Sequence, residues 1–437
     1  MQRFYGWLYD RFMASGRAGE EPLDITPQAH RSQRQSIGIH LLALTLNRTG
    51  DVLADAKLIL PWLLGAVGAP LFLVAWLVPV RESLALLPQL ILAQWIRRFP
   101  RRGGLWSAGC LVQGLSALGM GLVPLSPWSG ATAGNLVLGL LALFSLARCL
   151  CSIVIKDTMG KTIDRRRRGQ VSGFATSLGG LVGMALALSL MLGWLSDTSR
   201  MALGLVLLLA GFAWLLAALV YRSLPEWPDA APASRGANAA LKDYGKLIRD
   251  PHFQRFLLTR GLFLSTALVA PFYVVLARQQ GGSDLAGLGT LLLMAALANL
   301  ISGNIWGRLA DHSSRRVLVM AGILCGLLAF CVILGQLRHW PIVSSNWWYG
   351  LVIFVLYLAH AGVRLGRATY LVDMARAHNR AQLVALGNTI IGLVLLLAGA
   401  ALSLAGPQAI LWLIAILGSL SWLAALSAWA LPEVTAV

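Results

Sequence analysis

A succession of long apolar stretches constrains this chain more than any other feature of its sequence. Each stretch has about 20 residues or more, the length that an α-helix needs to cross the hydrocarbon core of a bilayer. Hydrophobic residues make up 57% of the 437 residues, and charged residues only 12%. Soluble domains carry about 25% charged residues, so a water-soluble globular fold is excluded. The sequence predicts an all-α integral membrane protein.

Twelve such stretches fit the chain as transmembrane helices. They cover residues 38–64, 71–95, 105–125, 134–156, 169–192, 200–221, 256–278, 285–306, 317–337, 347–371, 381–404 and 407–430. A long hydrophilic interruption between Arg222 and Arg255 separates two sets of six spans. The predicted layout is therefore an N-terminal tail (1–37), a six-helix bundle (38–221), a central loop (222–255), a second six-helix bundle (256–430) and a C-terminal tail (431–437).

The basic residues of the chain are distributed very unevenly between the two sides of this layout. The net charge is +18, which in a soluble protein would raise nucleic acid as a partner. On the side of the two tails lie 27 basic residues, whereas the other side holds three, Arg200, Arg278 and Arg338. This asymmetry is what the positive-inside rule describes. We expect both termini in the cytoplasm, a bacterial plasma membrane as the location, and no nucleic-acid partner.

The sequence allows two alternative structures for the first 15 residues. No cleaved signal is expected, because residues 1–35 lack an apolar core of secretory length. Phe4, Leu8 and Phe12 recur every four residues, a pattern typical of a helix that lies in the membrane interface. A disordered tail is the alternative.

The two halves carry traces of an internal repeat. Asp157 follows Arg148 by nine residues, and Asp373 follows Arg364 by the same interval. The two arginines are 216 residues apart, close to half the chain. Related halves of this kind are typical of transporters built from repeated bundles.

A loop after the eighth span gives the chain a family resemblance. Residues 307–316 read GRLADHSSRR, and Gly307, Asp311, Arg315 and Arg316 match the signature loop of the major facilitator superfamily. His312 and Ser314 depart from that pattern, whose positions there are a basic residue and a glycine. The first half keeps only the closing arginines, and Arg97 stands where the pattern has Asp.

The resemblance extends to the whole chain in span number and two-half layout, and implies two pseudo-symmetric bundles that carry a solute. In the family this loop forms a conformational gate, in which the Asp pairs with neighbouring arginines and helix ends in the outward-open state. The resemblance gives that role to Asp311. At Arg97 the brace must be absent or rebuilt with reversed charge. The alternative is that both loops are solvated basic turns.

Nine charged residues fall inside the predicted spans when Arg260, near the start of the seventh span, is counted with the basic residues of the central loop and its approach to that span. Each costs about 2.5–3.5 kcal/mol at the centre of a membrane helix, so they must face one another or water. They are Arg48, Lys57, Arg81, Arg148, Arg364, Arg367, Asp51, Asp55 and Glu82.

The carboxylates of the first two spans allow two interpretations. Asn47, Asp51 and Asp55 are spaced by four and are predicted to share one face of a continuous helix, while Glu82 follows Arg81 in the second span. They form either a fixed salt-bridge network or a group that takes up and releases protons.

The tenth span carries a polar face made of Tyr357, His360, Arg364 and Arg367. In the superfamily the first, fourth, seventh and tenth helices line the central cavity, which implies that Arg148 and Arg364 face each other there. Guanidinium groups suit carboxylates and phosphates, so an anionic substrate is expected. The alternative is that Arg364 and Arg367 reach toward the membrane surface, and that His360 is a packed polar residue rather than a proton relay.

The sequence thus predicts a monomeric secondary carrier of a small anionic or zwitterionic solute that works by alternating access. Arg148, Arg364, Arg367, Tyr357 and Arg81 are the predicted substrate-binding residues, and Asp51, Asp55, Glu82 and His360 the predicted proton-coupling residues. A proton-driven exporter of drugs or cations is the first alternative, and a sensor or assembly factor without transport activity the second. We expect no enzymatic activity, cofactor or metal, because neither a phosphate-binding Gly-rich loop nor a metal-ligand pattern is found.

Overall fold

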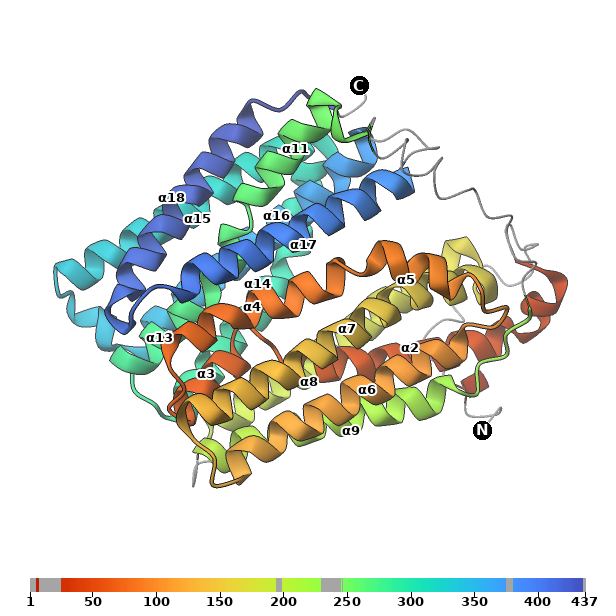
Figure 1. Ribbon diagram of the computed structural model, residues 1–437, viewed down its shortest axis with the longest axis horizontal. Coiled ribbons are helices and arrows are strands. Elements are labelled where there is room, and N and C mark those ends of the chain that lie inside the picture. The colour runs from red at the N-terminus through yellow and green to blue at the C-terminus, as the bar shows by residue number, and fades with distance from the viewer. Residues whose placement is uncertain are drawn as a thin grey trace.

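The computed structural model describes residues 5–7, 25–193, 199–228, 245, 247–374 and 380–434. In these residues the regular structure is helical throughout, and the helices form two groups of six passes (Figure 1). The groups lie together at the end formed by α3 (Ile59–Ala66) and α13 (Ala270–Gln280), here named the closed end. They diverge toward the end where both termini lie, here named the termini end. The predicted all-α fold with two six-helix bundles is confirmed.

The first half contains α2 to α9. Its further elements are α2 (Pro27–Leu53), α4 (Leu71–Leu86), α5 (Gln89–Ile96), α6 (Gly103–Leu122), η1 (Val123–Leu125), α7 (Gly130–Thr162), α8 (Arg165–Met191) and α9 (Ser199–Tyr221). Three passes are composite, since α2 continues into α3, α4 into α5, and α6 into η1.

The second half contains α11 to α18. Its further elements are α11 (Pro251–Leu262), α12 (Ser265–Leu268), α14 (Leu285–His312), α15 (Ser314–Leu337), η2 (Pro341–Ser344), α16 (Asn346–Met374), α17 (Arg380–Ser403), η3 (Pro407–Ala409) and α18 (Ile410–Trp429). The pass equivalent to α2–α3 is the broken series α11, α12 and α13.

Within the described residues, eleven passes are long and apolar enough to cross a membrane. The pass made of α2 and α3 is the twelfth. It is less apolar than the others because α2 carries polar side chains along its length, among them His40, Asn47, Arg48 and Asp51, and α3 has only 8 residues.

Helix caps place two helix starts earlier than apolar content predicts. Helix α2 begins at Pro27 rather than at residue 38, and Thr26 Oγ1 accepts the backbone N–H of Ala29. Helix α11 begins at Pro251 rather than at residue 256, and Asp250 accepts the N–H of His252. Both starts combine an N-cap oxygen with a proline at the first helical position, which are strong start signals in polar sequence.

The first pass is interrupted between α2 and α3, so the predicted continuous helix through Asp55 is wrong. Asp55 Oδ1 accepts the backbone N–H groups of Lys57 and Leu58, each at 2.8 Å. A short carboxylate satisfies backbone donors outside a helix and thereby competes with helix continuation. Asn47 and Asp51 lie on α2, whereas Asp55 lies in the break.

The halves are joined along two helix pairs, α4 with α17 and α8 with α14. A Cβ at Gly289 of α14 would lie 2.8 Å from the Ala187 carbonyl oxygen of α8, and one at Gly399 of α17 would lie 2.7 Å from Pro79. Small residues let membrane helices approach this closely. Both contacts lie toward the closed end, where they hold the two halves side by side.

Only residues 5–7 of the first 15 are described, so the alternatives for that segment lie mostly outside the described residues. Tyr5 is buried, and its hydroxyl lies 3.4 Å from Ser223 Oγ.

Candidate functional site

Asp51 lies among three arginines contributed by α2, α4 and α7. Arg148 Nη1 and Nη2 donate to its two oxygens at 2.5 and 2.6 Å, a bidentate pair. Arg81 Nη2 donates to Asp51 Oδ1 at 3.1 Å, and Arg48 Nη1 lies 3.8 Å from Oδ2. Bidentate pairs fix geometry as well as charge. This network therefore braces the first half internally.

Neighbouring side chains hold the two paired arginines in place. Asn47 Oδ1 accepts from Arg148 Nη1 at 3.4 Å. The guanidinium carbon of Arg81 lies 4.4 Å from the centre of the Phe144 ring, a cation–π contact. Both arginines thus have partners within their own half, and this limits how freely they can turn toward a solute.

Arg364, the repeat counterpart of Arg148, has a different environment. It lies exposed on α16, and no hydrogen bond or ion pair joins it to the described residues. Its charge acts on Arg48, Lys57 and Arg367, which places it between the halves. Asp51 neutralises Arg148, whereas the guanidinium N–H donors of Arg364 remain available to an anion.

Two hydrogen bonds cross between the halves on the closed-end side of Arg364. Lys57 Nζ lies 3.0 Å from His360 Nε2, and Tyr357 donates to Asp55 Oδ1 at 3.4 Å. Within the second half, His360 Nδ1 lies 3.0 Å from Thr266 Oγ1. The two breaks, α2–α3 and α11–α12, are thereby linked through α16.

Glu82 of α4 is half-buried and makes no hydrogen bond or ion pair with any described residue. Its charge acts on Lys57, Arg81 and Arg367, so it lies close to the same central group. Among the three predicted proton-coupling carboxylates, it is the one whose oxygens are not already occupied in the described structure.

Arg260 belongs to this region, although its place near the start of the seventh predicted span put it among the charges of the central loop and its approach to that span. It lies on α11 and is 7% exposed. Its Nη2 donates to Asn388 Oδ1 at 2.7 Å, and Asn388 Nδ2 donates to Gln89 Oε1 at 2.9 Å. The signal that would have found it is the Asp250-Pro251 helix start, which puts residue 260 in the third turn of a helix.

The predicted gate loop, residues 307–316, is largely helical. It covers the last residues of α14, Ser313 and the first residues of α15, at the termini end. Gly307 faces open space, and Asp311 is exposed with no hydrogen bond or ion pair to the described residues. Arg315 Nε lies 3.1 Å from Glu433 Oε2, and Ser313 Oγ donates to the same carboxylate at 2.9 Å.

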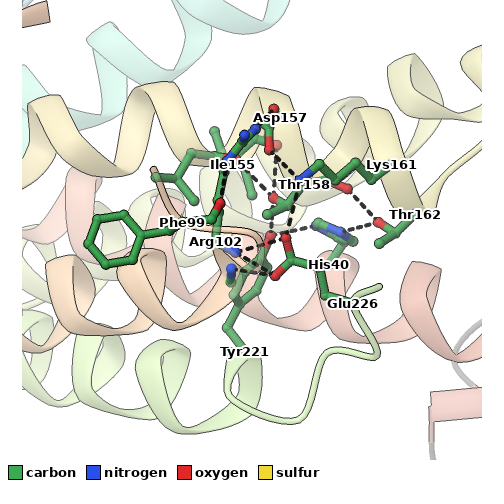
Figure 2. Close-up of polar contacts among 12 residues, drawn as sticks. His40, Phe99, Arg102, Ile155, Asp157, Thr158, Lys161, Thr162, Tyr221 and Glu226 are labelled. Carbon is green, nitrogen blue, oxygen red and sulfur yellow. Dashed lines mark hydrogen bonds and ion pairs between the residues drawn. The ribbon is translucent and has the colours of Figure 1, made fainter. Parts of the chain in front are cut away.

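Glu433 follows the last pass of the second half, and an acid in the same place after the last pass of the first half, Glu226, binds the matching loop there. Glu226 accepts the backbone N–H of Arg102 at 2.8 Å and that of Gly103 at 2.6 Å, at the start of α6 (Figure 2). Arg102 also pairs with Asp157, which binds Lys161 at 3.2 Å. The sequence signal for both acids is a repeated dipeptide, Pro225-Glu226 and Pro432-Glu433.

Beside this cluster lies a buried polar group formed by α2, α7 and α9 (Figure 2). Tyr221 OH lies 2.6 Å from Thr158 Oγ1 and 3.4 Å from His40 Nδ1, and His40 Nε2 lies 3.0 Å from Thr162 Oγ1. These bonds fasten the termini end of the first half. The described His, Cys, Asp and Glu side chains form no group of three suited to a metal ion.

Comparison with known proteins identifies the family. Residues 45–399 match the family model of the Major Facilitator Superfamily, which is most of the chain. The chain belongs to this superfamily, as the sequence resemblance implied. An uncharacterized protein of Mycobacterium tuberculosis is 23% identical over 186 residues, 42% of this chain and 35% of that protein. The match therefore spans about a third of the relative.

Several solved structures share the fold at low sequence identity. A POT family transporter in complex with a thioalcohol-conjugated peptide has a TM-score of 0.69 and 12% identity, with coverage of 89% of this chain and 94% of that one. A D-xylose-proton symporter has a TM-score of 0.61 and 12% identity, with coverage of 91% and 97%. At this identity both likenesses concern the fold alone.

Proposed function

We propose that this protein is a secondary active transporter that carries a small anionic solute by alternating access. The observation that supports the proposal best is the exposed guanidinium of Arg364, which has no described partner. The Arg48 side chain of the other half is 45% exposed and lies within the range of its charge. A carboxylate or phosphate between the two would receive donors from both halves.

The balance of charge in the central region favours an anion over a cation. Seven cationic side chains lie there against three carboxylates among the described residues, which leaves an excess of four positive charges. A solute with negative charge would lower this repulsion, whereas a cation would add to it. A zwitterion fits if its carboxylate binds Arg364. A cation or multidrug exporter is the weaker alternative.

We further propose that protons drive the transport and that Glu82 is the main group that carries them. Asp51 is engaged by arginines and Asp55 by backbone N–H groups, so protonating either would break existing bonds. Glu82 has no such bonds to lose within the described structure. A D-xylose-proton symporter of the same fold supports proton coupling as a working proposal.

The cycle would proceed by rocking of the two halves about the central site. Separation at the closed end requires that the Lys57–His360 and Asp55–Tyr357 bonds break. Closure at the termini end would bring Asp311 to a partner, as the gate role requires. With both termini in the cytoplasm of a bacterium, the arrangement of Figure 1 faces the cytoplasm.

The test of the substrate class is thermal stabilisation of the purified monomer by a panel of carboxylates, organic phosphates, amino acids and organic cations. A ligand that binds the folded state raises its unfolding temperature by mass action. We expect stabilisation by anions that Arg364→Gln removes and that Arg255→Gln, a change of an exposed cation on α11, retains. Stabilisation by cations, unchanged in Arg364→Gln, would contradict the proposal and favour the exporter. Absence of any ligand would favour a sensor or assembly factor.

A further inference from the structure

Arg260 is a buried cation whose charge has no carboxylate partner in the described structure. It is 7% exposed, and Asn388 Oδ1 is the acceptor of its one described hydrogen bond. Its Nε is buried and has no acceptor. A guanidinium has five N–H donors, so most of its binding capacity is unused. An unpaired charge in such a position is strongly unfavourable.

The surroundings of Arg260 hold it at the boundary between the halves. Asn388 of α17 directs its oxygen toward Arg260, because its amide nitrogen donates to Gln89 Oε1 of α5 at 2.9 Å. Gln89 belongs to the first half, and Arg260 and Asn388 belong to the second. The neutral amide side chains of Asn388 and Gln89 therefore orient the guanidinium and do not compensate its positive charge.

A second cation, Arg367, lies on the neighbouring helix α16. The Phe256 ring of α11 stacks on the Tyr370 ring of α16 with centroids 5.6 Å apart, and Arg260 and Arg367 each lie about one helical turn from these rings. The charge of Arg367 acts on Arg260, and Arg367 has no hydrogen bond or ion pair within the described residues. Glu82 attracts Arg367 without forming an ion pair with it in this structure. Two neighbouring guanidinium groups repel each other unless an anion lies between them.

We propose that Arg260 and Arg367 form a second anion subsite, and that the transported solute therefore carries two anionic groups. This inference rests on the proposed anion transport at Arg364. Arg364 and Arg367 are three residues apart on α16, which separates them by about 4.5 Å along the helix axis. A short dianion with carboxylate or phosphate ends would place one end at Arg364 and the other at the Arg260–Arg367 pair.

The experiment measures the binding of matched anions to the purified full-length protein by thermal shift. Succinate is compared with butyrate, which has the same carbon chain and one carboxylate, and with 3-phosphonopropionate, which replaces one carboxylate by a phosphonate. Malonate and adipate test the spacing. We expect both dianions to bind at least about tenfold more tightly than butyrate, the gain of one charge-assisted pair. The tighter of the two identifies which acid the subsite prefers.

Variants separate the subsite from the main site. Arg260→Gln should reduce succinate binding to the level of butyrate and leave butyrate binding unchanged, and Arg367→Gln should act in the same direction. Arg364→Gln should remove the binding of both. Without ligand, Arg260→Gln should not lower the unfolding temperature, because it removes an uncompensated charge. Arg255→Gln on the exposed face of α11 is the matched control and should change neither the binding of succinate nor that of butyrate.

The outcomes that overturn the inference are distinct from those that overturn the proposed function. If butyrate and succinate bind equally well, or if Arg260→Gln keeps the preference for succinate, the second subsite is wrong while anion transport stands. If Arg260→Gln no longer changes succinate binding when it is made in the Glu82→Gln background, Arg260 is an intramolecular partner of Glu82. The subsite is then again wrong. If no anion binds the wild-type protein, the proposed function itself fails.

Discussion

Lys57 Nζ lies 3.0 Å from His360 Nε2, and this hydrogen bond joins the helix break of the first half to the tenth pass. An ammonium group can only donate, so Nε2 must accept and the proton of the neutral ring must lie on Nδ1. Nδ1 then donates to Thr266 Oγ1 at 3.0 Å. The bond requires a neutral His360, which makes the contact between the halves sensitive to protonation of this ring.

Breaking this bond should shift the protein toward opening at the closed end. We expect His360→Gln, which cannot take up a proton, to remove the pH dependence of the distance between the halves. In the wild type, acidification should widen the closed end, because a second cation would face Lys57, with Arg364 and Arg367 already nearby. Spin labels at Ser129→Cys and Ser283→Cys, both exposed at that end, would report the distance after Cys331→Ser. An equal response of wild type and variant to pH would exclude His360 as the sensor.

Asp51 should be a strong determinant of stability. Asp51→Asn leaves Arg148 and Arg81 without a counter-charge, and breaking a buried pair on one side costs about 3–5 kcal/mol. The double variant with Arg148→Gln should recover part of that loss, because it removes one orphaned cation. Thermal unfolding in detergent measures both. Additive losses in the double variant would show that the pair is not energetically coupled.

Glu82 should matter for coupling and much less for stability. Glu82→Gln is expected to abolish solute accumulation driven by a pH gradient in proteoliposomes and to retain solute exchange without a gradient, because the carrier can still reorient when loaded. Asp55→Asn is the matched comparison, since Asp55 accepts backbone N–H groups and its loss should weaken folding as well. Gradient-driven accumulation that persists in Glu82→Gln would assign the proton to another residue.

Much of the fold could be predicted because apolar length and charge asymmetry act over whole helices. The central site was less accessible to sequence reasoning. Asp55 has helical spacing from Asp51, yet its carboxylate takes up backbone N–H groups and ends the helix. Arg148 and Arg364 look equivalent in the repeat, but Asp51 lies beside the first only. Such differences depend on partners from other helices, which a single sequence does not place.

Glu226 and Glu433 occupy related positions but should contribute unequally to stability. The Glu226 side chain is 5% exposed and accepts two backbone N–H groups at the start of α6, where the helix dipole also favours an anion. Glu226→Ala should cost about 1–2 kcal/mol, as the loss of a strong N-cap does. The Glu433 side chain is 38% exposed, so Glu433→Ala should cost less than about 1 kcal/mol.

Thermal unfolding of the two variants side by side checks this order. High salt should weaken the effect of Glu433→Ala more than that of Glu226→Ala, because exposed ion pairs are screened and buried hydrogen bonds are not. Glu226→Gln serves as the control for volume and should retain part of the N–H acceptance through its amide oxygen. Equal losses in the two alanine variants would mean that burial at the start of α6 adds nothing to the stability of the first half.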